Sequence, residues 1–213
     1  TRLKAVLNLW AGVEAVAGNK TLNVPLARMV DAGLTEGMVE WCVGHALRHH
    51  LGMDAHIEGQ DGIWRNATVP PLARNRPVTV LGLGTLGTAV ARALCGLGFP
   101  VTGWSRSAKH IDGLRCLHGA DGLPRALSTA SIVILLLPDT AATENTLNAN
   151  SLRVLPKGAT VINPGRGPLI DDDALLHALD TGHIDHATLD VFRQEPLPED
   201  HPYWAHPKVT VTP

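Results

Sequence analysis

From residue 78 onward, short runs of apolar and β-branched residues alternate with longer amphipathic segments. The apolar runs predict strands at residues 78–81, 101–104, 132–136, 160–162, 187–189 and 209–211. Apolar positions spaced at about 3.6 residues predict helices at 86–97, 123–127 and 172–180. Strands that are apolar throughout and separated by helices are typical of a parallel sheet covered on both faces. We therefore expect an α/β fold with a doubly wound parallel sheet.

The residues before 78 follow a different pattern. Residues 3–9 and 25–30 predict strands, and residues 10–14 predict a turn into a short helix. Thr35 is a candidate N-cap for a long helix that reaches about residue 51. Apolar positions on one face of this helix are Met38, Trp41, Cys42 and Ala46.

Residues 52–77 are polar, contain prolines and show no helical or strand period, which predicts a linker. A linker of this length is usually functional or forms an interface. We therefore divide the chain into residues 1–34 as part of a smaller substrate domain, 35–76 as a hinge helix with an interface linker, and 77–213 as a dinucleotide-binding domain.

The turn after the first strand of the predicted sheet carries the spacing G-x-G-x-x-G at Gly82, Gly84 and Gly87. In a strand–turn–helix unit the first glycine allows the sharp turn, the second lets the backbone approach a pyrophosphate, and the third lets helix and strand pack closely. Backbone N–H groups at the start of the following helix, near Thr85 and Leu86, point toward such phosphates. Glycines in such a turn can also be purely structural. The flanking strand and helix favour a Rossmann-like dinucleotide site.

The second predicted strand of this sheet ends at Trp104, Ser105, Arg106 and Ser107. Dinucleotide sites often place an acidic residue here to bind the ribose 2′-hydroxyl, and no carboxylate is present. Arg106 can instead hold a 2′-phosphate through charge-assisted hydrogen bonds, although it can also be an ordinary surface arginine. This pattern predicts NADP as cofactor, with NADPH preferred over NADH.

Two later segments lie at the ends of predicted strands, where a doubly wound sheet binds its ligands. In the first, Arg166 can hold a carboxylate in a bidentate pair or form a salt bridge on the surface. In the second, Asp190 and Glu195 face the same edge, and a carboxylate beside a histidine orients it and raises its pKa. Glu195 can equally be a solvated loop residue.

Composition narrows the function classes. Net charge is −2 and hydrophobic residues make up 45% of the 213 residues, so neither nucleic-acid nor membrane binding is indicated. Cys42, Cys95 and Cys116 lie far apart, which predicts reduced thiols of the cytoplasm. His45, His49 and His50 share a predicted helix, but no H-E-x-x-H motif or third ligand accompanies them, so we expect no metal site.

The glycine turn, residues 163–167 and residues 190–196 occur in this order, and together they resemble the D-isomer-specific 2-hydroxyacid dehydrogenase family. Residues 104–106 and 189–198 most resemble its glyoxylate/hydroxypyruvate reductase A branch. The resemblance covers nearly the whole chain. It implies a homodimer that uses NADPH to reduce a small 2-oxo acid, such as glyoxylate or hydroxypyruvate, to the 2-hydroxy acid.

The resemblance also implies residue roles. Arg166 would bind the substrate carboxylate and carbonyl, Glu195 would pair with the catalytic histidine, and Asp190 would lie near the nicotinamide carboxamide. Backbone N–H groups of a substrate loop would hold the carboxylate at Trp10, Ala11 and Gly12. The remaining cofactor contacts would come from Met38, Thr85, Leu86, Ser107, Leu137, Pro138, Thr143, Pro164 and Gly165.

In the family, the catalytic histidine directly follows a Thr-Pro pair that matches Thr212 and Pro213. We therefore expect this sequence to be a fragment that lacks the proton donor. The same family includes co-repressors that use the dinucleotide to control assembly. A dinucleotide-binding co-repressor-like module, or a non-catalytic module of the same fold, is thus the alternative function.

Overall fold

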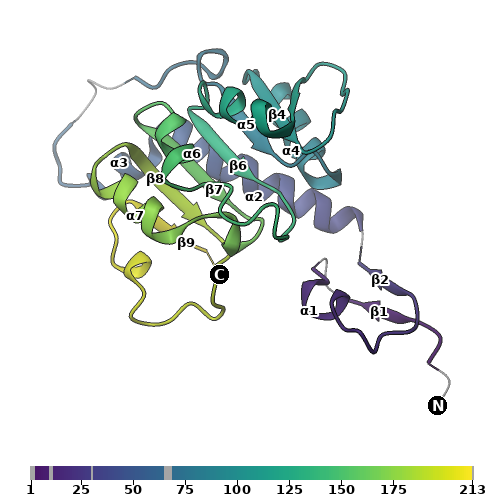
Figure 1. Cartoon of the computed structure of the whole chain (residues 1–213). Helices are drawn as coiled ribbons and strands as arrows, with labels where there is room; N and C mark the ends of the chain where they lie inside the picture. The colour runs from purple at the N-terminus through teal and green to yellow at the C-terminus, as the bar shows by residue number, and fades with distance from the viewer. Residues whose placement is uncertain (1–2, 10–11, 30, 65–68, 213) are drawn as a thin grey trace. The chain divides into compact units, whose positions relative to one another are not determined.

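The structure is a computed structural model that describes residues 3–9, 12–29, 31–64 and 69–212. It contains two compact units, Thr1–Gly37 and Met38–Pro213, which we describe separately. In the first unit, β1 (Val6–Asn8) pairs in parallel with β2 (Leu26–Arg28), and the short helix α1 (Glu14–Ala17) lies between them in sequence (Figure 1). Both strands are shorter than the sequence predicts. The domain boundaries given above stay a prediction.

Helix α2 (Ala32–Leu51) begins four residues earlier than a helix with Thr35 as its N-cap would. Thr35 is not its N-cap, because its backbone N–H already donates to the carbonyl of Asp31 inside the first turn. The carboxylate of Asp31 accepts a hydrogen bond from the N–H of Gly33 at 3.0 Å, which satisfies one of the unpaired donors at the helix start. The aspartate, not the threonine, therefore marks the beginning of α2.

The second unit is built on a seven-stranded parallel sheet in the order β5-β4-β3-β6-β7-β8-β9. Its strands are β3 (Val78–Leu81), β4 (Val101–Ser105), β5 (Arg115–His118), β6 (Ile132–Leu135), β7 (Ala159–Asn163), β8 (Ile184–Leu189) and β9 (Val209–Val211). The order runs outward from β3 in both directions, as in a doubly wound sheet, so the predicted fold class is confirmed. Strand β5 was not predicted, because it is a half-exposed edge strand with little apolar character.

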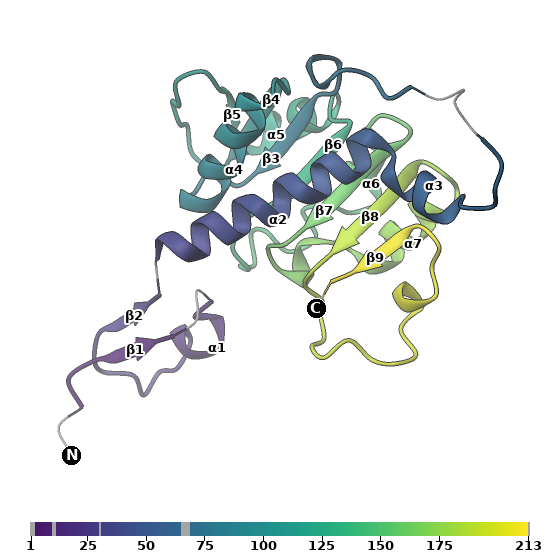
Figure 2. The same cartoon turned by 180° about the vertical axis from the view of Figure 1, so that it is seen from behind.

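Helices cover both faces of this sheet. Helix α2 and α4 (Thr85–Gly96) lie against one face, as Figure 2 shows. Helices α5 (Gly119–Leu127), α6 (Ala149–Val154) and α7 (Asp172–Asp180) cover the other. Asp171 caps α7 by accepting from the N–H of Ala174, as its acidic run indicates.

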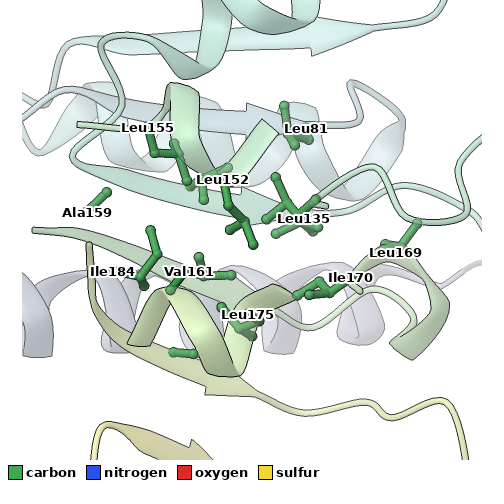
Figure 3. Close-up of a cluster of buried hydrophobic side chains, with 14 of the residues drawn as sticks. Leu81, Leu135, Leu152, Leu155, Ala159, Val161, Leu169, Ile170, Leu175 and Ile184 are labelled. Carbon is green, nitrogen blue, oxygen red and sulfur yellow. The ribbon is translucent and has the colours of Figure 1, made fainter. Parts of the chain in front are cut away.

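The buried residues alternate along each strand as two covered faces require. Val78 and Val80 contribute to the core beneath α2 and α4, whereas Leu81 contributes to the opposite core. In that second core, Leu152 from α6 and Leu175 from α7 point toward the strands (Figure 3). The two apolar layers fix the strand ends, and the candidate site lies along those ends.

The predicted linker is not entirely irregular. Residues 52–77 contain α3 (Met53–Glu58) and a 3-10 turn, Ala73–Asn75, and further 3-10 turns lie at Gly167–Leu169 and Pro202–Trp204. Gly52 separates α2 from α3 with a left-handed backbone (φ +62°) that costs glycine little. None of the helices in the described part of the chain is both long enough and apolar enough to cross a membrane.

Candidate active site

The glycine turn lies where β3 meets β6, at the point from which the strand order runs outward. A Cβ added at Gly82, whose φ is +106°, would lie 2.4 Å from the carbonyl oxygen of Leu136. A Cβ at Gly87 would lie 1.7 Å from the carbonyl oxygen of Gly82. Both positions therefore exclude any side chain, for the turn and for the packing of α4 on β3.

Gly84 differs from these two glycines. It directly precedes α4, and a Cβ added there meets no atom within 4 Å. The space in front of the helix N-terminus is thus open on the side where Thr85 and Leu86 begin the helix. An open, side-chain-free approach to unpaired backbone N–H groups fits the pyrophosphate of a dinucleotide.

The end of β4 lies beside this turn. The Trp104 indole N–H donates to the carbonyl of Gly119 at 2.9 Å, and the Ser105 hydroxyl donates to the carbonyl of Ser107 at 2.9 Å. These bonds shape the loop on which Arg106 is exposed to solvent. The Lys109 ammonium donates to the carbonyl of Leu83, inside the glycine turn. Sequence reasoning missed Lys109, although a second basic residue just after Arg106 was a usable signal.

The other predicted cofactor contacts lie at the ends of neighbouring elements. Leu137 is buried two residues after the end of β6, and the Thr143 hydroxyl closes the following loop by donating to the carbonyl of Pro138 at 2.7 Å. On α2, Met38 lies one turn before Cys42 and accepts from its thiol. Burial and, to a smaller extent, the charge of Asp190 raise the pKa of Cys42 to about 12, so this part of α2 lies close to the end of β8.

The turn that carries Arg166 follows β7 directly. The Asn163 side chain, which is buried, accepts from the N–H of Gly165 at 3.1 Å and donates to the carbonyl of Arg166 at 2.9 Å. The guanidinium of Arg166 donates to the carbonyl of Gly165 at 2.6 Å. A Cβ at Gly165 would lie 2.8 Å from the carbonyl oxygen of Leu135. The Asn163 side chain thus holds the turn in place through two hydrogen bonds to its backbone. The sequence analysis did not assign this role.

Asp190 and Glu195 lie at the same edge, after β8. The Asp190 carboxylate accepts from the Thr212 hydroxyl at 2.9 Å, which ties it to the residue that follows β9. Burial raises the pKa of Asp190, the bond from Thr212 opposes this, and the negative charge of Glu195 raises it further. The Glu195 carboxylate accepts from the N–H of Phe192 at 2.9 Å, which folds the loop back on itself.

The Arg166 turn and the Glu195 loop are in direct contact. A Cβ at Gly167 would lie 1.9 Å from the carbonyl carbon of Phe192, so backbone packs on backbone there. The Arg193 guanidinium donates to the carbonyl of Ile170 at 2.7 Å, and it lies 3.6 Å from the carboxylate of Asp172. Sequence reasoning missed Arg193, because its partners are distant in sequence.

Two of the predicted substrate-loop residues, Trp10 and Ala11, lie outside the described residues. Gly12 belongs to the first unit, where its carbonyl accepts from the Asn8 side chain at 2.6 Å. The role of these three residues in binding substrate therefore stays a prediction.

A pocket of about 190 Å³ lies beside the Glu195 loop and is lined by Asp172, Phe192, Arg193, Gln194, Leu197, Pro198, His201 and Tyr203.

Comparison with known proteins gives the family. Residues 42–213 match the model of the D-isomer specific 2-hydroxyacid dehydrogenase, NAD binding domain. The glyoxylate/hydroxypyruvate reductase A of Serratia proteamaculans is 40% identical over 220 residues, which cover 100% of this chain and 70% of that protein. The protein of the same name from Photorhabdus laumondii is 41% identical, over 99% of this chain and 70% of its own length.

Solved structures agree. A D-isomer specific 2-hydroxyacid dehydrogenase from Xanthobacter autotrophicus, in complex with NADPH and MES, superposes with a TM-score of 0.94 at 43% identity, covering 99% of this chain and 67% of that one. The NADPH-dependent glyoxylate/hydroxypyruvate reductase of Sinorhizobium meliloti, with NADP and sulfate, has a TM-score of 0.94 at 36% identity, covering 99% and 68%. The chain therefore belongs to the D-isomer specific 2-hydroxyacid dehydrogenase family, in its glyoxylate/hydroxypyruvate reductase A branch.

Proposed function

We propose that this protein reduces a small 2-oxo acid, of the glyoxylate or hydroxypyruvate type, to the 2-hydroxy acid with NADPH. One observation carries the proposal: a single edge of the sheet brings together the glycine turn, the Arg166 turn and the Glu195 loop. The relatives quoted above are named as reductases, which favours catalysis over the alternative of a co-repressor-like or non-catalytic module.

Within this proposal, the cofactor is held by the chain's own groups. Backbone N–H groups after Gly84 bind the pyrophosphate, and Arg106 binds the 2′-phosphate, with Lys109 adding positive charge beside the same turn. When bound, the reduced nicotinamide supplies the hydride. Leu137, Pro138, Thr143 and Met38 line the cleft, and Pro164, Gly165 and Asp190 border the nicotinamide end.

The substrate groups act on the other side of the reacting carbon. Arg166 orients the carboxylate of the oxo acid and polarises its carbonyl, because a planar guanidinium can bind two oxygens at once. A proton must reach the developing alkoxide, and the resemblance assigns this to a histidine directly after Pro213, oriented by Glu195. A positioned acid of this kind contributes about 10²–10⁴-fold to the rate.

Arg166→Lys tests this function. Lysine keeps the charge but loses the planar fork, so we expect turnover of glyoxylate to fall strongly while NADPH affinity is unchanged. The measurement is NADPH oxidation in a chain that continues through the expected histidine, with cofactor affinity followed by NADPH fluorescence. The same chain with alanine at the histidine position should bind NADPH and turn over negligibly. Near-normal turnover by Arg166→Lys would remove Arg166 from the catalytic set.

We also propose that the protein is a cytoplasmic homodimer. Exposed apolar side chains are frequent along the segment from the end of α2 to β3, at Leu51, Met53, Ile57, Ile63, Trp64, Val69 and Leu72. Trp64 is 89% exposed, and so many exposed apolar side chains in one segment favour a surface that a protein partner covers. Three free cysteines fit a reducing compartment.

A further inference from the structure

Three side chains of the types that ligate metals lie close together outside the candidate active site, on the end of α2, on α3 and on β8. His49, Asp54 and His186 each offer one ligand atom, and these atoms lie within 4.8 Å of one another. The Nδ1 atom of His49 is 4.0 Å from Oδ2 of Asp54. The two imidazole rings have centroids 4.8 Å apart. These residues come from three separate elements, so the fold itself brings them together.

The neighbouring helical histidines do not belong to this group. His45 packs against Trp41 with the rings tilted and their centroids 4.4 Å apart, and His50 packs edge-on against Phe99 at 5.0 Å. The spacing of His45 and His49 along the helix is therefore not the relevant feature. The fold supplies the further ligands that the helix sequence lacks.

Each candidate ligand is held by a second partner. The Nε2 atom of His49 is 2.8 Å from the Thr188 hydroxyl, and Nε2 of His186 is 2.8 Å from the Thr210 hydroxyl. When a threonine oxygen accepts the ring N–H at Nε2, the other ring nitrogen keeps its lone pair for a metal. Histidine ligands commonly have such an outer hydrogen bond, which fixes the tautomer and the orientation of the ring.

Charge around the group is mixed. Arg48 donates from Nε to Oδ1 of Asp54 at 2.6 Å, leaving Oδ2 on the side of His49. Burial, then the neighbouring His186 and Arg48, lower the pKa of His49 to about 3, and burial also lowers the pKa of His186. Imidazole binds metals in its neutral form. The Arg48 cation opposes metal binding and limits its affinity.

We propose that His49, Asp54 and His186 form a binding site for a divalent transition metal ion, best matched by Zn²⁺. Two imidazoles and one carboxylate are a ligand set that zinc uses, with water in the fourth position. A tetrahedral zinc ion holds its ligand atoms roughly 3.3 Å apart, so ligand atoms that now lie up to 4.8 Å apart must approach by up to about 1.5 Å. Asp54 can supply the movement toward His49, from 4.0 Å, because it is only partly buried, on a short helix.

The test is a zinc titration of the full chain after removal of metals with a chelator, in competition with a metal-sensitive dye. We expect one equivalent of Zn²⁺ to bind, and Asp54→Asn and His186→Gln each to weaken binding at least tenfold. His56→Ala is the matched control, because His56 is an exposed histidine on the same helix as Asp54. The chain has 11 histidines, so the control separates this site from unspecific binding.

Two further readouts keep the result interpretable. Co²⁺ bound to these ligands should give the visible absorption of a four-coordinate site in the unmodified chain and in His56→Ala, but not in Asp54→Asn. Zn²⁺ should raise the Tm of the unmodified chain and leave that of Asp54→Asn unchanged, since a ligand that binds only the folded state stabilises it. Equal zinc affinity in Asp54→Asn, with its circular dichroism unchanged, would overturn the proposal, as would loss of binding in His56→Ala.

Discussion

Arg106 is the residue on which the choice of cofactor depends, because the end of β4 holds no carboxylate and Arg106 is exposed there. We expect Arg106→Ala to weaken NADPH binding by about tenfold to a hundredfold, the cost of losing charge-assisted bonds to a phosphate. NADH binding should change little, since it lacks that phosphate. Fluorescence titration with both cofactors checks this, and an equal loss for both would show that Arg106 does not bind the 2′-phosphate.

Substitutions at Gly87 and Gly84 distinguish the packing of α4 on β3 from the binding of the cofactor at the same turn. Gly87→Ala places a methyl group 1.7 Å from a backbone oxygen, so we expect a destabilisation of about 1–3 kcal/mol or more and a lower Tm. Gly84→Ala meets open space and should leave the Tm nearly unchanged while weakening NADPH binding. Thermal unfolding and cofactor titration of both variants make the comparison. A stable Gly87→Ala variant would contradict the close packing of α4 on β3.

Among the elements, the turn after β7 depends on a single side chain. Asn163→Asp removes the amide donor to the carbonyl of Arg166 and sets a carboxylate against that oxygen. Because the site is buried, we expect a loss of about 1–3 kcal/mol in the free energy of unfolding. Asn150→Asp is the control, since Asn150 is exposed and uses its side-chain oxygen to accept from Arg153. Denaturant unfolding measures the free energy of unfolding of both variants. Equal losses in the two would argue against a stabilising role of the Asn163 side chain in this turn.

At this scale, the sequence predicts apolar elements well and polar ones poorly. Strands β3 and β9 have the predicted bounds, because apolar runs between turns leave few alternatives. Helix α6 was missed because six residues are too few for a helical period to show, although its capping box at Asn148 and Ser151 was a usable signal. The same limit applies to the site. Asp190 and Glu195 could be placed at one edge from strand ends, whereas the contacts of Arg193 and His186 depend on distant chain segments.

For the whole molecule, the exposed apolar side chains between α2 and β3 predict association. We expect Trp64→Ser to shift the proposed homodimer toward monomer, because removing an exposed indole reduces the apolar area that association buries. Leu97→Ser, at an exposed apolar position outside this segment, is the control. Light scattering over a range of concentrations gives the mass of each variant. An unchanged mass in Trp64→Ser would place the interface elsewhere.

The backbone contact between Gly167 and Phe192 also bears on how this scaffold could be diversified. In a mutant library that varies position 167, almost every variant would carry a side chain that prevents the Arg166 turn from packing on the Glu195 loop. Substrate preference is better altered by varying residues around the Arg166 turn and the Glu195 loop, while Gly167 is kept. The Arg166 turn and the Glu195 loop would then stay constant as one packed unit. New substrate specificities would have to arise from changes in the residues that surround this unit.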